Sequence, residues 1–546
     1  MKKNLLLLFI LLSSKLFAQP ACQWAYMATS ATNANHTVFN AIYDLNGDII
    51  QAGFITGVVD MNPGTALTDT AYSFVGDNFY LAKYSPSGAL LWIKYFKSLG
   101  SFATFDFTGI AINSANDIIV TGNYFGLIDF DLSDAGVDTI RSHFPTYPDY
   151  FVAKYNPNGN YQWAFSIGAT QNNTIESRSV LIQPNDDIVV AAYPNGTVDV
   201  DPSVAVHNCI QGNAVLVCYD VNGNYVWDTN NFPSNYSYAQ YDKSFDSDAA
   251  GNIFLMSVGY YELTVTKFSA SGTKLWERKI GDFASQARVN PQSVLVDKQS
   301  GDFYVAGTFG GTVDFDPGVN TTNITSSSWN YQDGFIAKYN ANMNLLWANQ
   351  YAGKLEFGKF SLDFFGNEII SAGKISGTIN FGNGVTLNAS AAFNPFYLKL
   401  STAGVTSEAF VLSGTGYFNS IVSSGTQAFL TTGGVATNTD MDPTATNYTL
   451  TSNTSGFAAF YNYSPSAVLQ HANAASFEVY PNPAGNFIKI KLEQKSFIEL
   501  TDAAGKVFYS EKRVEEGEHF IDVSFLADGI YFLRCNYAVR RVEVLR

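Results

Sequence analysis

Cysteine is scarce in this sequence, which excludes a fold held together mainly by disulfide bonds. The 546 residues include four cysteines, Cys22, Cys209, Cys218 and Cys535. Small disulfide-dependent folds have a much higher density. Cys209 and Cys218 flank a bend that contains Asn and Gly, so they are placed to face each other across a hairpin in an oxidising compartment. The alternative is two buried thiols, and the sequence alone leaves both open.

Positive charge and long apolar runs are also scarce. There are 31 Lys and Arg against 47 Asp and Glu, which gives a net charge of −16. This excess of negative charge argues against nucleic acid as a partner and against simple attraction to anionic membranes. Beyond the N-terminus no segment has the roughly 18 consecutive apolar residues of a membrane-spanning helix. We therefore expect no nucleic-acid partner and no transmembrane segment.

Motifs for catalysis and for cofactors are missing as well. The five histidines are scattered, and no Cys/His group has the spacing of a zinc site. Neither a phosphate-binding loop nor a nucleophile elbow is present. The sequence therefore predicts no catalytic residue and no cofactor, with calcium as the one alternative discussed below.

The N-terminus has the pattern of a secretory signal peptide. Lys2 and Lys3 precede an apolar run from Leu5 to Leu12, and Leu16–Ala18 offers a small-residue cleavage site. Such a charged start, short apolar core and cleavage site are typical of exported proteins. We expect residues 1–18 to be removed. A lipoprotein cleaved before Cys22 is the alternative, but the Leu expected three residues upstream of that cysteine is absent.

Glycine and aromatic residues are abundant, and one phrase recurs along most of the chain. The 44 Gly and 15% aromatic residues favour an all-β protein with many turns. The recurrent phrase starts with Lys-Tyr or a variant, makes a turn and ends in Trp. Because the Trp positions are locked to the repeat, we expect them to pack between repeats rather than to form a sugar platform. The five full copies are Lys83–Trp92, Lys154–Trp163, Cys218–Trp227, Lys267–Trp276 and Lys338–Trp347.

The best-preserved repeat unit predicts four short strands. They are Phe303–Ala306, Thr312–Asp316, Phe335–Tyr339 and Leu345–Trp347, separated by Gly, Pro and Asn turns. Such a unit cannot bury its apolar residues alone and must stack on neighbours.

Seven phased units predict a seven-bladed β-propeller, in which radial closure protects the strand edges. Seven Lys-Tyr strands have only six convincing return strands, and Gln23–Tyr26 is left over at the start of the mature chain. We expect this N-terminal strand to complete the last blade. An open solenoid is the alternative, but it would need polar end caps that are not evident.

The repeat resembles a known bacterial family. Its phrase D-x-x-G-N/D-x-x-x-x-G-x-F-x-G-T-V-D-F-D-P, followed by D-x-F-x-A-K-Y-x-x-x-G-x-x-x-W, is similar to that of seven-bladed β-propeller repeat proteins found in secreted and surface proteins of bacteria. The resemblance implies a propeller over residues 19–463. It says little about function, because this fold hosts binders, scaffolds and enzymes.

The C-terminal part is a different module. Residues 464–474 have lost the repeat and predict a linker, and residues 475–546 predict a small Ig-like β-sandwich of about seven strands. Its phrases YPNP, LTDAAGK and LADGIYFLR resemble the type A C-terminal sorting domain of the type IX secretion system of Bacteroidota. The resemblance implies that the secretion machinery is a partner, that the domain is removed, and that the protein is released or attached to the outer surface.

Paired acids are the one polar pattern that recurs. Two acids spaced by two on a strand share a face, and hard oxygen ligands in that arrangement suit Ca²⁺. The favoured interpretation is a structural turn, because catalytic sites are rarely copied around a ring and the second Asp opens an Asp-Pro turn. The calcium candidates are Asp129, Asp131, Asp199, Asp201, Asp314, Asp316, Asp440 and Asp442, with Asp60 and Asn62 as a further pair.

The function predicted is a secreted or cell-surface propeller that acts as a binding, adhesion or scaffold module for an unknown glycan or protein. Its contacts would come from loops that differ between repeats, at 62–77, 133–149 and 321–333, since recognition is usually carried by loops on a rigid scaffold. The alternative is a secreted hydrolase or lyase acting on polysaccharide, with its site in the central funnel.

Overall fold

The computed structural model describes residues 20–463 and 479–545, except for short segments. The excepted segments are 28, 31–34, 57, 62–69, 73–77, 100–103, 134–135, 145–146, 169–172, 210–213, 230–244, 259–261, 282–286, 329–332, 390–391, 426, 436–438, 445–448, 451–454, 493–495, 503–506, 515 and 536–537. The expected signal peptide and linker lie outside the described residues, as does most of the loop at 62–77.

The chain divides into two compact units, residues 1–463 and 464–546. Every regular element described is a β-strand, and no helix able to span a membrane is found among the described residues.

The described part of the first unit contains seven antiparallel four-stranded meanders, numbered here in chain order. Meanders 6 and 7 are joined into one eight-stranded sheet by a single parallel bridge between Phe360 and Ser420. Meanders 1 to 3 consist of β3 (Asn35–Tyr43), β4 (Ile49–Thr56), β7 (Asn78–Tyr84) and β8 (Leu90–Tyr95); β10 (Thr104–Ile112), β11 (Ile118–Phe125), β14 (Asp149–Tyr155) and β15 (Tyr161–Ile167); and β16 (Thr174–Ile182), β17 (Ile188–Asn195), β20 (Val215–Tyr219) and β21 (Tyr225–Asp228).

The remaining meanders follow the same order of strands. Meanders 4 and 5 consist of β22 (Phe245–Ser247), β23 (Ile253–Val258), β24 (Leu263–Phe268) and β25 (Lys274–Ile280); and β26 (Arg288–Val296), β27 (Phe303–Gly310), β30 (Asp333–Tyr339) and β31 (Leu345–Tyr351). Meander 6 consists of β32 (Lys354–Phe365), β33 (Glu368–Ser376), β36 (Asn394–Ser401) and β37 (Thr406–Val411), and meander 7 of β38 (Gly416–Ser423), β39 (Ala428–Val435), β42 (Ser455–Asn462) and β1 (Ala21–Met27).

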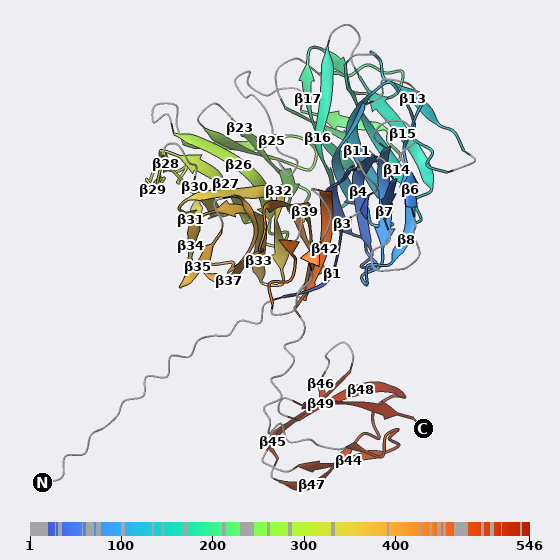
Figure 1. Cartoon of the computed structure of the whole chain (residues 1–546), viewed down its shortest axis with the longest axis vertical. Coiled ribbons are helices and arrows are strands. Elements are labelled where there is room, and N and C mark those ends of the chain that lie inside the picture. Colours follow the sequence, from blue (N-terminus) through green and yellow to red (C-terminus); the bar gives the residue numbers. More distant parts are fainter. Residues whose placement is uncertain are drawn as a thin grey trace, which may run out of the picture. The chain divides into compact units, whose positions relative to one another are not determined.

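The N-terminal strand completes the last meander. β1 pairs with β42, the last strand before residue 463, and Trp24 lies opposite Phe460 in the register. Figure 1 shows β1 beside β42 although the two strands come from opposite ends of the first unit. The prediction that the strand around Trp24 belongs to the last repeat is therefore confirmed.

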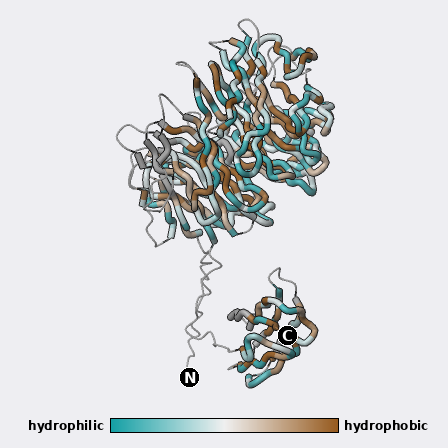
Figure 2. Tube along the Cα trace, turned by 90° about the vertical axis from the view of Figure 1, so that its right-hand side faces the viewer, coloured by the Kyte–Doolittle hydropathy of each residue, from teal (hydrophilic) through white to brown (hydrophobic). Residues whose placement is uncertain are grey.

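The hydrophobic cores lie between consecutive meanders. In the described part of the first unit, each of the seven hydrophobic core clusters takes buried residues from two neighbouring meanders. The cluster that contains Trp24 and Leu430 of meander 7 also contains Ala41 and Tyr80 of meander 1, so the last meander packs on the first. Hydrophobic residues run along the strands, and hydrophilic residues gather at the outer turns (Figure 2). The all-β propeller expected from the repeats is thereby confirmed.

The strand assignment within the repeat was partly wrong. The element around Asp314, expected as the second blade strand, belongs to a separate two-stranded ribbon, β28 (Thr312–Asp314) and β29 (Asn323–Thr325). The innermost strand, β26, precedes the Asp297 turn and was not predicted. Equivalent short strands are β5 (Val58–Asp60) and β6 (Thr70–Tyr72) with β2 (Thr29–Ser30); β12 (Leu127–Asp129) and β13 (Thr139–Arg141) with β9 (Lys97–Ser98); β18 (Val198–Asp199) and β19 (Asn208–Cys209); β34 (Thr378–Gly382) and β35 (Val385–Asn388); and β40 (Thr439–Asp440) and β41 (Thr449–Leu450).

The recurrent tryptophans pack against the turn of the following meander. The indole of Trp24 lies against Gly88, whose φ is +84°, so closely that a Cβ built there would be 2.9 Å from the ring. Glycine fits because it tolerates positive φ and leaves room for the ring. In meander 5 the position is taken by Met343, also at positive φ and packed in a core with Trp276. The other pairs are Trp92 with Gly159, Trp163 with Gly223, Trp227 with Gly272, and Trp347 with Gly404.

The Lys-Tyr phrase is explained by two recurrent contacts. The Lys ammonium pairs with acids of the turn between the first two strands of its meander; Lys83 lies 2.7 Å from Asp44 and 3.0 Å from Asp48. The Tyr hydroxyl donates to the backbone carbonyl between the paired acids of the ribbon, and so ties ribbon to meander. These hydroxyl bonds are Tyr84 to Met61, Tyr155 to Phe130, Tyr219 to Val200, Tyr339 to Phe315 and Tyr461 to Met441.

Cys209 and Cys218 are free, buried thiols and do not form a disulfide. Cys209 contributes to the core between meanders 2 and 3, whereas Cys218 contributes to the core between meanders 3 and 4. The two side chains therefore serve different interfaces, which explains why they do not meet. The side chain of Cys535 lies outside the described residues.

The second unit is a small two-sheet sandwich, as expected. One sheet has the order β43-β44-β47 and the other β46-β45-β48-β49, and a shared core includes Ile488, Leu500 and Leu533. The strands are β43 (Val479–Tyr480), β44 (Phe487–Leu492), β45 (Ser496–Asp502), β46 (Val507–Val514), β47 (Gly517–Asp522), β48 (Gly529–Cys535) and β49 (Ala538–Val544).

Candidate functional site

The predicted calcium candidates cap the ribbon turns. In the four ribbons that carry these candidates, the first acid accepts the backbone N–H of the second acid, at 3.1 Å from Asp129 to Asp131, Asp199 to Asp201 and Asp440 to Asp442, and at 3.0 Å from Asp314 to Asp316. Three of the first acids also accept an N–H from the return side of the ribbon, namely those of Asp138, His207 and Thr322. One carboxylate oxygen of the first acid is thus used to hold the turn.

The second acid of each pair has a similar role two residues further on. Its Oδ1 atom accepts the N–H of Ser133, Ser203, Gly318 or Thr444. This geometry is the side-chain-to-backbone turn that Asp commonly forms. Among the described residues no group of three or more His, Cys, Asp or Glu is arranged to hold a metal ion. The side chain of Asp60, and the whole of Asn62, lie outside the described residues.

Two of these acids, however, also line a polar groove between meanders 2 and 3. The groove has a volume of about 690 Å³. Meander 2 contributes His143, Ser166, Ile167 and Gly168, and meander 3 contributes Asn173, Thr197, Asp199, Asp201, Ser203 and Asn208. Pockets of this size are typical of small-ligand sites, although most of those have more apolar walls.

A histidine fixed by a buried carboxylate forms one wall of the groove. The Asp149 side chain is 2% exposed, and its Oδ2 atom lies 2.7 Å from Nδ1 of His143, which is 44% exposed. The same carboxylate accepts the backbone N–H of His143 and the hydroxyl of Ser166. Gly168 makes room for it, because a Cβ there would lie 2.0 Å from the carboxylate. The hydrogen bond to Asp149 raises the pKa of His143 above its usual value, and burial offsets part of this rise.

His143 departs from the repeat, whereas its partner does not. In meander 5 the equivalent carboxylate is Asp333, which accepts the backbone N–H and the hydroxyl of Ser327 and the amide of Gln350. Ser327 stands where meander 2 has His143. The buried Asp therefore belongs to the scaffold, and the imidazole is a replacement specific to meander 2.

The opposite wall is acidic and held by the ribbon of meander 3. Asp201 lies 3.7 Å from Nε2 of His207, and the His207 ring stacks on Tyr225 with centroids 4.1 Å apart. Asn173 donates to the carbonyl of Thr197 at 3.4 Å and lies against Gly196, whose φ is +115°. Together, the two walls offer carboxylates, amides, hydroxyls and one imidazole.

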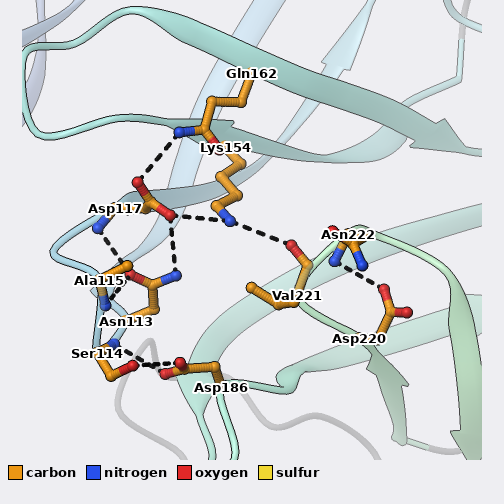
Figure 3. Close-up of polar contacts among 10 residues, drawn as sticks. All are labelled: Asn113, Ser114, Ala115, Asp117, Lys154, Gln162, Asp186, Asp220, Val221 and Asn222. Atoms are coloured by element: carbon orange, nitrogen blue, oxygen red, sulfur yellow. Dashed lines mark hydrogen bonds and ion pairs between the residues drawn. The ribbon is translucent and has the colours of Figure 1, made fainter.

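At the other end of these meanders, hydrogen bonds connect meander 2 directly to meander 3. β14 begins beside the groove with Asp149. Near its other end, Lys154 lies 3.0 Å from Asp117 of its own meander and donates to the carbonyl of Val221 in meander 3 at 3.3 Å. Ser114 donates its backbone N–H to Asp186 of meander 3 at 2.8 Å. Figure 3 shows Lys154 between Asp117 and Val221, with the contact of Ser114 and Asp186 beside them. Polar side chains at this end thus fasten neighbouring turns to each other.

The sequence singled out Asp199 and Asp201 as candidate site residues, but it did not single out His143. The structure brings Asp199 and Asp201 together with His143, while Asp314, Asp316, Asp440 and Asp442 cap turns away from this groove. A signal was present in the sequence, since alignment of the ribbons sets His143 against Ser327. The pairing with Asp149 could not be inferred before the strand order was known.

The C-terminal unit has a clear relative among protein families. Residues 478–542 match the family described as the secretion system C-terminal sorting domain. The second unit carries a type IX sorting domain. This sorting domain indicates export through the type IX secretion system, and its function implies an interaction with that machinery.

The similar proteins and structures found for this chain do not indicate a function. A stretch of 246 residues, 40% of this chain, is 26% identical to an uncharacterised WD repeat-containing protein, L264, of Acanthamoeba polyphaga mimivirus, and spans 17% of that protein. Similar solved structures include an unknown-function protein from Dyadobacter fermentans, with 9% identity over 80% of this chain and 97% of that chain and a TM-score of 0.37. The Dos1 propeller has 12% identity over 82% of this chain and 96% of that chain, with a TM-score of 0.41.

Proposed function

We propose that the propeller is an extracellular binding module and that its ligand enters the groove between meanders 2 and 3. In this proposal residues 1–18 direct the first export step and are cleaved. The sorting domain then carries residues 19–463 across the outer membrane, where the propeller is released or attached to the surface.

One observation carries the proposal: the groove contains an imidazole that the scaffold does not require. Lys83, Tyr84 and their equivalents recur because they hold meanders and ribbons together. His143 binds Asp149, and at the equivalent position of meander 5 Ser327 binds Asp333. A serine is therefore sufficient for this contact, and the imidazole is not needed for it. A polar side chain in a concave site, beyond what the fold needs, is typical of ligand recognition.

The binding role is tested with the purified full chain on an array of extracellular polysaccharides and proteins. We expect saturable binding to at least one probe, and weaker binding by H143S, which copies the serine of meander 5 and keeps the contact with Asp149. Absence of binding to every probe, or equal binding by H143S, would overturn the role assigned to the groove.

The export role has its own test in a host with a type IX secretion system. The full chain is expected in the medium or on the cell surface, and a chain ending at residue 463 is expected to remain in the periplasm. Equal export of the two chains would contradict it.

The alternative of a secreted polysaccharide hydrolase or lyase gains one point from the His143–Asp149 pair, because a carboxylate-bound imidazole can act as a general base. Asp199 and Asp201, however, each hold a turn through one carboxylate oxygen, as their equivalents do in meanders 5 and 7. Release of reducing ends, or of unsaturated products, by the full chain would favour the enzyme over the binder.

A further inference from the structure

The hydrogen-bonding groups of the groove indicate the chemical class of its ligand. The carboxylates of Asp199 and Asp201 only accept hydrogen bonds, whereas the amides of Asn173 and Asn208 both donate and accept. No Lys or Arg occurs among the described residues that line the groove. An anionic ligand would meet two carboxylates, and the positive charge that His143 can carry is already paired with Asp149. A ligand that offers many donors and acceptors and no negative charge fits best.

These groups are also held in place before any ligand arrives. Oδ1 of Asp199 accepts the N–H of Asp201 and of His207, and Oδ1 of Asp201 accepts the N–H of Ser203. The ring of His143 is fixed through Nδ1 to Asp149, which leaves Nε2 as its second polar atom. Because the carboxylates and the imidazole are positioned by the fold, little conformational entropy is lost when a ligand binds.

Ser166 adds a hydroxyl of fixed orientation to the wall of meander 2. Its hydroxyl donates to Asp149 at 3.0 Å, and a hydroxyl oxygen can accept a hydrogen bond as well. Among the described residues of the lining, the apolar side chains are those of Ile167, Val198 and Pro202. The groove therefore offers small apolar areas between hydrogen-bonding groups, which matches the alternation of C–H and O–H groups on a sugar ring.

We propose that the groove between meanders 2 and 3 binds a neutral oligosaccharide, whose hydroxyls donate to Asp199 and Asp201 and accept from Asn173 and Asn208. The proposal rests on the binding role proposed above and narrows it to one ligand class. A cationic ligand, such as an amino sugar polymer or a basic peptide, is the competing outcome.

The test measures binding of the full chain to three probe sets by calorimetry. The sets are neutral glucan, mannan, xylan and galactan oligosaccharides; oligosaccharides of uronic acids; and chitosan oligosaccharides with oligolysine. The variants are D199N/D201N, in which Asn keeps the Oδ1 acceptor that holds the turn, and H143S. The matched control is D314N/D316N, the same change in a ribbon away from the groove.

We expect a neutral oligosaccharide to bind and D199N/D201N to weaken its binding about tenfold or more, since hydrogen bonds to charged acceptors are the stronger ones. H143S should also weaken binding, and D314N/D316N should leave it unchanged. Binding of uronic acid or cationic probes alone would overturn the ligand class while sparing the binding role. Binding of a neutral probe that none of the groove variants weakens would overturn the site, and no binding at all would overturn both proposals.

Discussion

The indole of Trp24 stacks on the ring of Phe460, with 5.7 Å between centroids and 8° between planes. These residues come from the first and last strands of the propeller, and their strands pair directly. The indole N–H also donates to the carbonyl of Pro86 in meander 1 at 3.2 Å. One side chain thus joins the N-terminal strand, the last meander and the first.

Loss of the Trp24 side chain should destabilise the contact between the last and the first meander. W24A removes the stacking on Phe460 and the contact with Gly88, and large-to-small changes of buried aromatic residues cost about 3–5 kcal/mol. We expect a lower denaturant midpoint for the propeller transition, measured by fluorescence or circular dichroism. Q23A changes an exposed neighbour in the same strand and is expected to have little effect. Equal stability of the two variants would contradict the role of Trp24.

The close approach of the indole to Gly88 makes a second prediction. Gly88 and Gly47 have φ values of +84° and +83°, but a Cβ at Gly88 would lie 2.9 Å from Trp24, while nothing lies within 4 Å of one at Gly47. Both Ala variants carry the cost of positive φ, about 1–2 kcal/mol. G88A should lose a further ~1–3 kcal/mol through overpacking. Similar free energies of unfolding for G88A and G47A would count against this contact.

The buried ion pair of meander 1 is expected to respond strongly to loss of one partner. The side chains of Lys83 and Asp44 are 7% and 2% exposed. K83M leaves the Asp44 carboxylate buried without its cation, a change that typically costs about 3–5 kcal/mol. The exposed pair of Lys274 and Glu277 is the control, and K274M should cost less than about 1 kcal/mol. Chemical denaturation of both variants makes the comparison, and equal losses would refute it.

The same pair should give the propeller an acid-dependent stability. Burial opposes ionisation of Asp44, but hydrogen bonds from Lys83 and from the N–H groups of Asn46 and Asp48 outweigh it and lower the pKa of Asp44. A lowered pKa contributes stability above the unfolded value of about 4, and this is lost as pH falls through the folded value. Between about pH 5 and pH 2, wild type should therefore lose more stability than D44N/K83M. Parallel curves would show that the pair does not contribute.

His143 should titrate above the usual range of histidine. The hydrogen bond to Asp149 raises its pKa, so its stabilising contribution is present below the unfolded value of about 6.5 and is lost as pH rises through the folded value. The midpoint is measured by NMR titration of the imidazole C–H signals, assigned by their absence in H143S. A midpoint at or below about 6.5 would mean that the pairing with Asp149 is not maintained in solution.

Much of the fold could be predicted from the sequence because the contacts that build it recur. The Trp of one meander packs on a turn residue of the next. The Lys of the Lys-Tyr phrase pairs with an acid of a turn, and the Tyr donates a hydrogen bond to a ribbon carbonyl. The innermost strands were missed for the opposite reason. Their residues at equivalent positions differ between meanders, as in Asp106, Glu176, Asn290 and Tyr417, so no common phrase marks them.

Meander 6 departs from the repeat at the position that the tryptophan takes in meander 5. Glu408 pairs with Lys399 where meander 5 pairs Trp347 with Lys338. In meander 7 the strand beside β42 is the N-terminal β1 rather than the next strand along the chain. Glu408 accepts the hydroxyl of Tyr463 at 2.7 Å. Burial raises the pKa of Glu408, partly offset by Tyr463 and Lys399. Such substitutions depend on the neighbouring meander, which a single repeat does not reveal.

The candidate site was predictable only in part. The paired acids were visible as a pattern, and the structure gives each a turn to hold. That Asp199 and Asp201 also face His143 depends on how meanders 2 and 3 pack, which is set by cores between them rather than by either repeat alone.

Hydrogen–deuterium exchange of the full chain, with and without the tightest-binding neutral oligosaccharide, tests the location of the site most directly. The account predicts slower exchange at the groove, around His143 and at residues 197–208, and unchanged exchange at the equivalent ribbon of meander 5, residues 312–325. Protection spread over the other ribbons, or confined to another part of the propeller, would contradict it.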